Sequence, residues 1–172
     1  QIQLVCPLPG DEVALVGKEG QKYNLTWVER EGDVVFSLPL TGFTAVNEIA
    51  ELDNNRVLVV GQSTMPNVKG KKDRITLCGR IAVVERNGRI VTDIYAGDQG
   101  SNFLKGMLLR SGAFVVSGSE PKGADGRQGI LLKLDPTGSV VYQYKNAGGG
   151  YCDQFAVMGN SIEYICAAFS AG

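Results

Sequence analysis

The amino-acid sequence predicts an all-β protein, and three features of it support this fold class. The apolar runs are short, about five to eight residues, and rich in Val, Ile, Leu, Tyr and Phe, with Gly, Asn and Asp between them. No window of a dozen residues keeps a helical period with caps at both ends. The nearest candidate, residues 45–55, is short and leads directly into a turn. The third feature is a repeat of hairpins, which sets the order of the elements.

One kind of hairpin occurs three times, and each copy has a strand, a charged pair, a turn with Gly and a second strand. The copies begin at Lys22, Gly79 and Gly129. Their turn glycines are Gly32, Gly88 and Gly138. Because a hairpin turn needs a residue with positive φ, which Gly adopts without steric cost, turns are predicted at these three positions.

A second kind of hairpin alternates with the first and holds two apolar runs around a tight polar turn. Its four copies end at Gly17, Ser63, Glu120 and Ser170. The second run of each copy is more uniformly apolar than the strands of the first kind. Such a strand is predicted to be buried on both faces.

The two kinds of hairpin together form a unit of four strands and about 50 residues, a length typical of repeat architectures. The 172 residues suit a single domain that holds about three and a half such units. The approximate units are 1–40, 41–96, 97–146 and, as a half unit, 147–172. Polar, Gly-rich links at 97–102 and 146–151 separate the later units.

The last full hairpin resembles a known family. Lys133, Leu134, Asp135 and Gly138, followed by the glycines at 148–150, resemble the β-propeller repeats common in bacterial secreted and lipoprotein-type proteins. The first two hairpins depart from this pattern, with Glu-Arg in place of Lys-Leu-Asp. The resemblance implies a β-propeller-like ring of four-stranded blades around a central axis and an exported protein, whether periplasmic, cell-surface or secreted. It does not imply one activity.

Three and a half blades do not close an ordinary ring, which has about four to eight. An open ring exposes apolar sheet faces and strand edges, which favour association. We therefore expect a partial ring or half of a larger ring, completed by remaining blades or by self-association. A four-bladed ring whose last blade has two strands is a further alternative, and a β-sandwich is the structural rival.

The composition excludes several kinds of site. The chain has no His, so a Ser-His-Asp triad, a Cys-His dyad and a His-ligated zinc site are excluded within it. Its four Cys form no Cys-x-x-Cys pair, which leaves half-buried thiols or one or two disulfides, among them a Cys152–Cys166 bridge. With 17 basic and 18 acidic residues, no nucleic-acid partner is expected. No apolar run reaches the roughly 18 residues of a membrane span, and no metal or cofactor is predicted.

Candidate ligand-binding residues lie on or beside the Gly-rich links, because the links of a propeller meet on one face near the axis. They are Asp98, Asn102, Tyr151 and Asp153. Asp98, Asp125 and Asp153 are also the carboxylates that a propeller glycosidase could use as a pair. An Asp in a Gly-rich turn more often binds its own backbone, and a mid-strand Trp27 is more often a packing residue than a stacking platform.

The sequence thus favours a non-enzymatic β-propeller module that binds a protein or a glycan. No catalytic set is evident, and the absence of His supports this interpretation. The alternative is the propeller portion of a carbohydrate-active enzyme. That alternative predicts a cluster of carboxylates and aromatic rings at 97–102 and 146–153.

Overall fold

The computed structural model is all-β, which confirms the predicted fold class. It describes residues 1–53, 55–65, 77–123, 126–146, 148–158 and 164–170. Fourteen strands and one short 3-10 turn, at Pro9–Asp11, make up the regular structure of these residues. None of the described segments is a helix with the length and apolar character that crossing a membrane would need.

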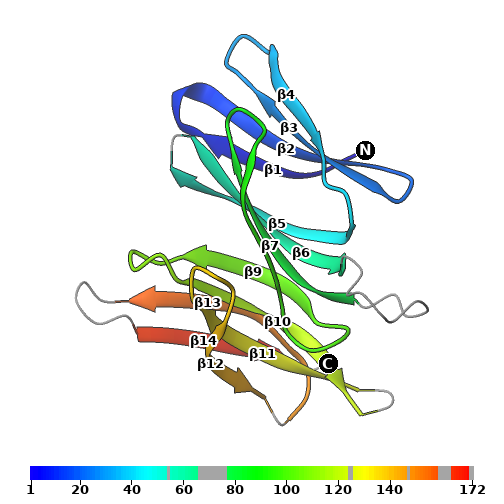
Figure 1. The fold of residues 1–172 in the computed structure, drawn as a ribbon, viewed down its shortest axis with the longest axis vertical. Coiled ribbons are helices and arrows are strands. Elements are labelled where there is room, and N and C mark those ends of the chain that lie inside the picture. The colour runs from blue at the N-terminus through cyan, green and yellow to red at the C-terminus, as the bar shows by residue number, and fades with distance from the viewer. Residues whose placement is uncertain (54, 66–76, 124–125, 147, 159–163, 171–172) are drawn as a thin grey trace.

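The strands form four antiparallel sheets, which we call sheets A to D in chain order (Figure 1). Sheet A contains β1 (Ile2–Leu8), β2 (Glu12–Glu19), β3 (Lys22–Val28) and β4 (Val34–Pro39). Sheet B contains β5 (Phe43–Asp53), β6 (Arg56–Thr64), β7 (Leu77–Glu85) and β8 (Ile90–Ala96). Sheet C contains β9 (Asn102–Leu108), β10 (Phe114–Lys122), β11 (Gly126–Leu134) and β12 (Val140–Lys145). Sheet D is a hairpin of β13 (Tyr151–Met158) and β14 (Tyr164–Ser170). In every sheet, consecutive strands of the chain lie side by side.

The turns of the three repeated hairpins have the same backbone geometry. Gly32, Gly88 and Gly138 have φ angles of 91°, 81° and 92°. Each of these amides donates a hydrogen bond to the carbonyl three residues earlier, at 2.9, 2.8 and 3.0 Å. The predicted turns are confirmed, and their positive φ explains why Gly occupies all three positions.

The sheets are stacked face to face in the order A, B, C, D, with one apolar cluster at each contact (Figure 1). The strand β6 shows how the sequence produces this stack. Its residues Val57 and Val59 pack in the cluster with sheet A, whereas Leu58 and Val60 pack in the cluster with sheet C. Because successive side chains of a strand point to opposite faces, a continuously apolar strand is buried on both sides. This confirms the burial predicted for β6.

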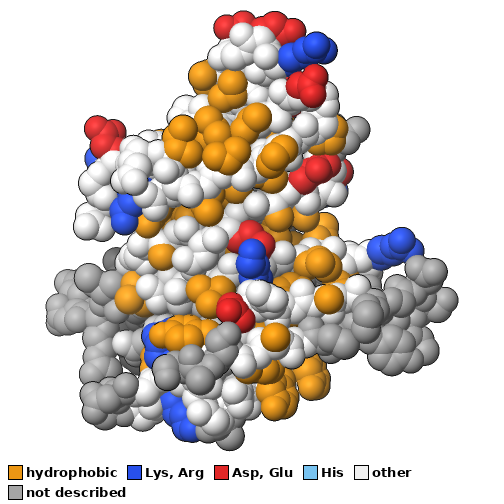
Figure 2. Space-filling model, turned by 180° about the vertical axis from the view of Figure 1, so that it is seen from behind, with side chains coloured by type: hydrophobic (Ala, Val, Ile, Leu, Met, Phe, Trp, Pro, Cys, Tyr) orange, Lys and Arg blue, Asp and Glu red, His pale blue; other side chains and the backbone are white. Residues whose placement is uncertain are grey.

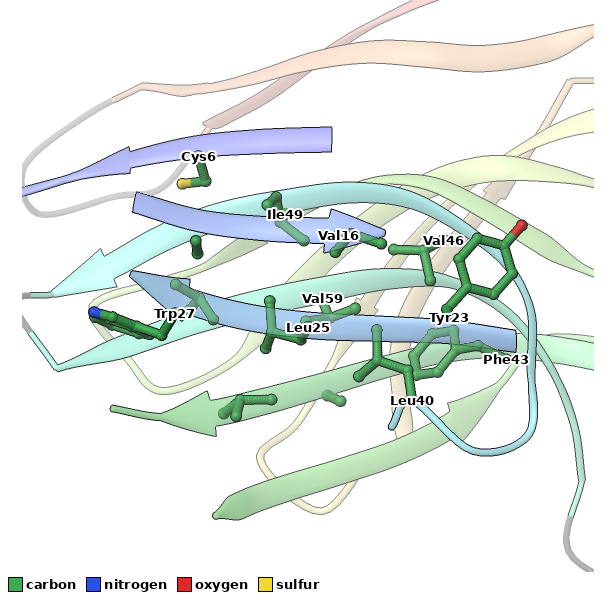
Figure 3. Close-up of a cluster of buried hydrophobic side chains, with 14 of the residues drawn as sticks. Cys6, Val16, Tyr23, Leu25, Trp27, Leu40, Phe43, Val46, Ile49 and Val59 are labelled. Carbon is green, nitrogen blue, oxygen red and sulfur yellow. The ribbon is translucent and has the colours of Figure 1, made fainter. Parts of the chain in front are cut away.

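The cluster between sheets A and B is built around Trp27 (Figure 3). Trp27, Leu25 and Val16 are fully buried, and they face Val59 of sheet B. The Trp27 ring lies 6.0 Å from the ring of Phe36, in a tilted arrangement. The interpretation of Trp27 as a packing residue is therefore confirmed.

A polar network closes one end of this cluster and ties the two sheets together. The indole Nε1 of Trp27 donates to Oε2 of Glu12 at 2.6 Å. Arg86, in the turn between β7 and β8, donates to both Glu12 oxygens at 2.6 and 3.1 Å. The hydrogen bonds from Arg86, and then from Trp27, hold the pKa of Glu12 below its usual range.

This network predicts a specific dependence of stability on pH. A carboxyl whose pKa is lowered by folding adds stability above its ordinary pKa of about 4.3, and that stability is lost as the pH falls. We expect Glu12→Gln to lower the free energy of unfolding by about 2 kcal/mol at pH 7, because charged hydrogen bonds are lost. The difference from the wild type should shrink as the pH falls from 5 to about 3. Urea unfolding at each pH measures it, with Glu31→Gln in an exposed turn as the control. A difference that stays constant over this range would contradict the prediction.

The described thiols are buried and unpaired. Cys6, Cys78 and Cys152 are free, and burial raises the pKa of Cys78 to about 11. In the last hairpin the register places Cys152 opposite Phe169, whereas Cys166 lies opposite Ala156. The sequence left a Cys152–Cys166 disulfide possible, and this prediction is wrong, because the two residues are not cross-strand neighbours.

Candidate functional site

The four predicted ligand-binding residues lie in different surroundings. Asp98 lies in the turn between β8 and β9, with 73% of its side chain exposed. Its Oδ2 accepts a hydrogen bond from Nζ of Lys145 at 2.9 Å, and the same Nζ lies 2.6 Å from Oε1 of Glu120. These contacts with Glu120 and Asp98 raise the pKa of Lys145. Asp98 thus takes part in a bridge from the link to the outer strand of sheet C.

Asn102 joins β9 to β5, the first strands of sheets C and B. We call the first strand of each sheet its innermost strand. The side-chain amide of Asn47, on β5, donates to Oδ1 of Asn102 at 2.7 Å and to the carbonyl of Phe103 at 2.6 Å. These bonds engage the side-chain oxygen of Asn102 inside the protein. We assign Asn102 to the contact between the sheets.

Tyr151 and Asp153 are the first and third residues of β13 and so belong to a strand instead of a link. The side chain of Tyr151 is exposed, and Asp153 lines a cavity. Asp125, the third predicted carboxylate, lies outside the described residues. Asp153 is therefore the predicted residue that leads to a candidate site.

The cavity next to Asp153 has a volume of about 300 Å³ and lies along the innermost strands of sheets B, C and D. Its lining combines charged, amide and apolar groups from three strands. The lining residues are Glu48 from β5, Lys105, Gly106 and Met107 from β9, and Asp153, Gln154 and Phe155 from β13. We call this the inner-strand cavity. A few converging polar groups beside an aromatic ring are typical of a small-ligand site.

The charges in the inner-strand cavity are held by a contact between sheets B and C. Nζ of Lys105 donates to Oε1 of Glu48 at 3.1 Å, and the amide of Gly106 donates to Oε2 of Glu48 at 2.6 Å. The Glu48 side chain is 17% exposed, and the Lys105 side chain is 48% exposed. Lys105 can therefore offer its remaining donors to a ligand while it stays paired with Glu48.

Sequence reasoning missed Glu48 and Lys105, although a signal for them was present. Lys105 is the one charged residue of an otherwise largely apolar β9, whereas Glu48 is one of three acidic residues in β5. A charge at such a position is either paired or functional, since an unpaired buried charge is costly. The cavity lies on these strands and not on the Gly-rich links where ligand binding was predicted.

A second cavity, of about 350 Å³, continues from the first along β9. The two share Gly106 and Met107. A Cβ atom on Gly106 would lie 2.7 Å from Cγ2 of Val60, so β9 approaches sheet B closely at this residue. The two cavities therefore lie next to each other along β9.

A larger hollow, of about 990 Å³, lies elsewhere, near the hairpin turns of sheets A and B. It is lined by Val35, Asp53, Asn55, Arg56, Glu85, Arg86 and Asn87. Its two guanidinium groups are engaged, because Arg56 donates to Asp53 at 2.7 Å and Arg86 donates to Glu12. The charges of this hollow thus stabilise the turns, and the inner-strand cavity is the better candidate site.

The described residues contain no group of three or more His, Cys, Asp or Glu side chains placed to hold a metal ion. Comparison of the sequence with known protein families and with curated proteins finds no match.

Proposed function

We propose that the chain is a non-enzymatic β-propeller module, part of an exported protein, that binds a glycan or a protein through the inner-strand cavity. The repeated four-stranded sheets and the likeness of the last hairpin to bacterial propeller repeats support the propeller assignment. The observation that carries the binding role is the convergence of Lys105, Asp153 and Gln154 beside Phe155.

The chemistry of the inner-strand cavity favours a glycan as its ligand. A sugar ring presents hydroxyl groups that both donate and accept hydrogen bonds, and it has apolar faces. Asp153 and Gln154 supply acceptors, Lys105 and Gln154 supply donors, and the half-buried ring of Phe155 supplies an apolar surface. The small volume suits one or two sugar units, whereas a protein ligand would need a larger surface.

The pKa shifts of the carboxyl groups agree with binding without catalysis. A glycosidase needs one carboxyl with a raised pKa as its general acid. Among the residues that the structure describes, the carboxyl groups with shifted pKa values, Glu12, Asp53 and Asp135, all shift downward. Within the inner-strand cavity, both carboxylate oxygens of Glu48 already accept hydrogen bonds, one from Lys105 and one from a backbone amide.

A glycan array with the labelled protein tests the proposal, alongside a panel of glycoside substrates for hydrolysis. We expect binding to a restricted set of glycans without turnover. Lys105→Met keeps the aliphatic stem and removes the ammonium group, so it should weaken binding by roughly tenfold or more. Lys22→Met, at an exposed strand end, is the matched control and should bind like the wild type. Hydrolysis of a bound glycan would overturn the non-enzymatic role, and binding unchanged by Lys105→Met would remove the cavity from it.

A further inference from the structure

The outer face of sheet A carries apolar side chains that no described part of the chain covers. The strand register places them in two adjacent rows across the sheet. One row is Val5, Leu15, Thr26 and Ser37, and the other is Pro7, Val13, Val28 and Val34. Val5 and Val34 are 57% and 60% exposed. Figure 2 shows apolar side chains gathered over the end of the molecule that sheet A forms.

The corresponding positions of sheets B and C are covered. Val57 of β6 and Phe114 of β10 occupy the place that Val13 has in β2, each four residues before the glycine that the three strands share. Their side chains lie on the face that points back along the stack. Val57 is fully buried in the cluster with sheet A, and Phe114 is 4% exposed in the cluster with sheet B. The outer face of sheet A therefore has the pattern of a face that another β-sheet covers.

We propose that a second copy of this chain covers this face with its own sheet A, as a two-fold symmetric dimer. The two rows contain no ionised side chain, so two identical faces can meet without repulsion between like charges. At the ends of the face the charges come in opposite pairs. Glu19 lies opposite Lys22 in the register, and Arg30 lies 3.7 Å from Asp11. A self-complementary face of this kind is what a two-fold interface requires.

The width of the face also favours this partner over a head-to-tail contact. Sheet A has four strands, whereas sheet D, at the other end of the stack, has two. The described residues of sheet D that point away from sheet C include Gln154, Ala156 and Ala168, which are exposed and small or polar. A hairpin of this kind would leave much of the apolar face of sheet A uncovered. A second sheet A covers all four strands, and this inference is independent of the proposed ligand.

Mass in solution tests the proposal, by size-exclusion chromatography with light scattering at tens of micromolar protein. The wild type should have twice the chain mass of 18.4 kDa. Leu15→Glu, at the centre of the face, should be monomeric and keep the wild-type circular dichroism spectrum. Val141→Glu places the same charge on β12, where Val141 is apolar and 63% exposed, and this variant should remain dimeric. Should Leu15→Glu fail to fold, Val5→Glu at the exposed edge of the face takes its place.

A charge-complementation experiment tests the two-fold geometry. Leu15→Glu and Leu15→Lys should each be monomeric alone, and an equimolar mixture should recover the dimer, because the two faces then carry opposite charges. A monomeric wild type would overturn the proposal, and so would a dimer that survives Leu15→Glu. Oligomers larger than two, or two monomeric variants that fail to associate on mixing, would indicate that sheet A does not meet a copy of itself.

Discussion

Replacing Gly61 by alanine is expected to lower the free energy of unfolding by at least about 3 kcal/mol. A Cβ atom on Gly61 would lie 2.0 Å from the carbonyl oxygen of Ala45 and 3.1 Å from Cα of Val46. Both obstacles are backbone atoms of β5, at a point where the register with β6 shifts. The side chain cannot turn away from them, so the strands must separate. Urea unfolding followed by Trp27 fluorescence measures the loss.

The repeat supplies matched controls for this substitution. Gly118 occupies the same place in sheet C, and its Cβ would lie 2.0 Å from the carbonyl oxygen of Asn102. Gly17 occupies that place in sheet A, but the nearest atom to its Cβ would be 3.8 Å away. Gly118→Ala should match Gly61→Ala, while Gly17→Ala should stay within about 1 kcal/mol of the wild type. A loss of about 3 kcal/mol corresponds to about 6–12 °C in Tm for a chain of this size. Equal stabilities of all three variants would contradict the prediction.

Replacing Arg80 by alanine should lower the free energy of unfolding by about 3 kcal/mol, because its buried guanidinium group makes several directed hydrogen bonds. Its side chain is 5% exposed, and it donates to the two oxygens of Asp93 at 2.7 and 3.0 Å. It also donates to the carbonyl of Thr41 at 2.7 Å, in the link between sheets A and B. The rings of Phe43 and Tyr95 lie 4.4 and 4.9 Å from its central carbon. Its loss leaves a carboxylate and a link carbonyl without their partner.

The comparison of three variants separates the geometry of Arg80 from its charge. Arg80→Lys keeps the charge but cannot form the paired bonds to Asp93, so it should still lose more than about 1 kcal/mol. Arg30→Ala removes an arginine that is 71% exposed and lies 3.7 Å from Asp11, and it should cost less than about 1 kcal/mol. Thermal and urea unfolding of the three proteins provide the measurement. Arg80→Lys with the full stability of the wild type would show that the charge alone matters.

The sequence identifies the local elements of this fold with little ambiguity. The turns at Gly32, Gly88 and Gly138 are recognisable because positive φ is a property of single residues. The burial of β6 on both faces is recognisable because side chains alternate along a strand. The segment 45–55, the nearest candidate for a helix, lies mostly in β5. Its buried residues Val46 and Ile49 are three positions apart, because the register with β6 shifts between Val46 and Glu48.

The site shows where local reasoning ends. Asp98 and Asn102 lie on the predicted link, yet their partners, Lys145 and Asn47, come from segments 47 and 55 residues away. The pair of Glu48 and Lys105 spans 57 residues and joins two sheets. The residues around Glu48 and around Lys105 in the sequence do not indicate that these two side chains meet.

The sequence by itself therefore determined the strands, the turns and which strands are buried on both faces, since these depend on neighbours within a few residues. Only the tertiary structure decided that Arg80 holds a link, that the backbone of β5 lies directly against Gly61, and that the candidate cavity lies on the innermost strands. Each of these depends on how closely one sheet, strand or link approaches another. That separation follows from the packing of all the side chains between them and cannot be read from any one segment.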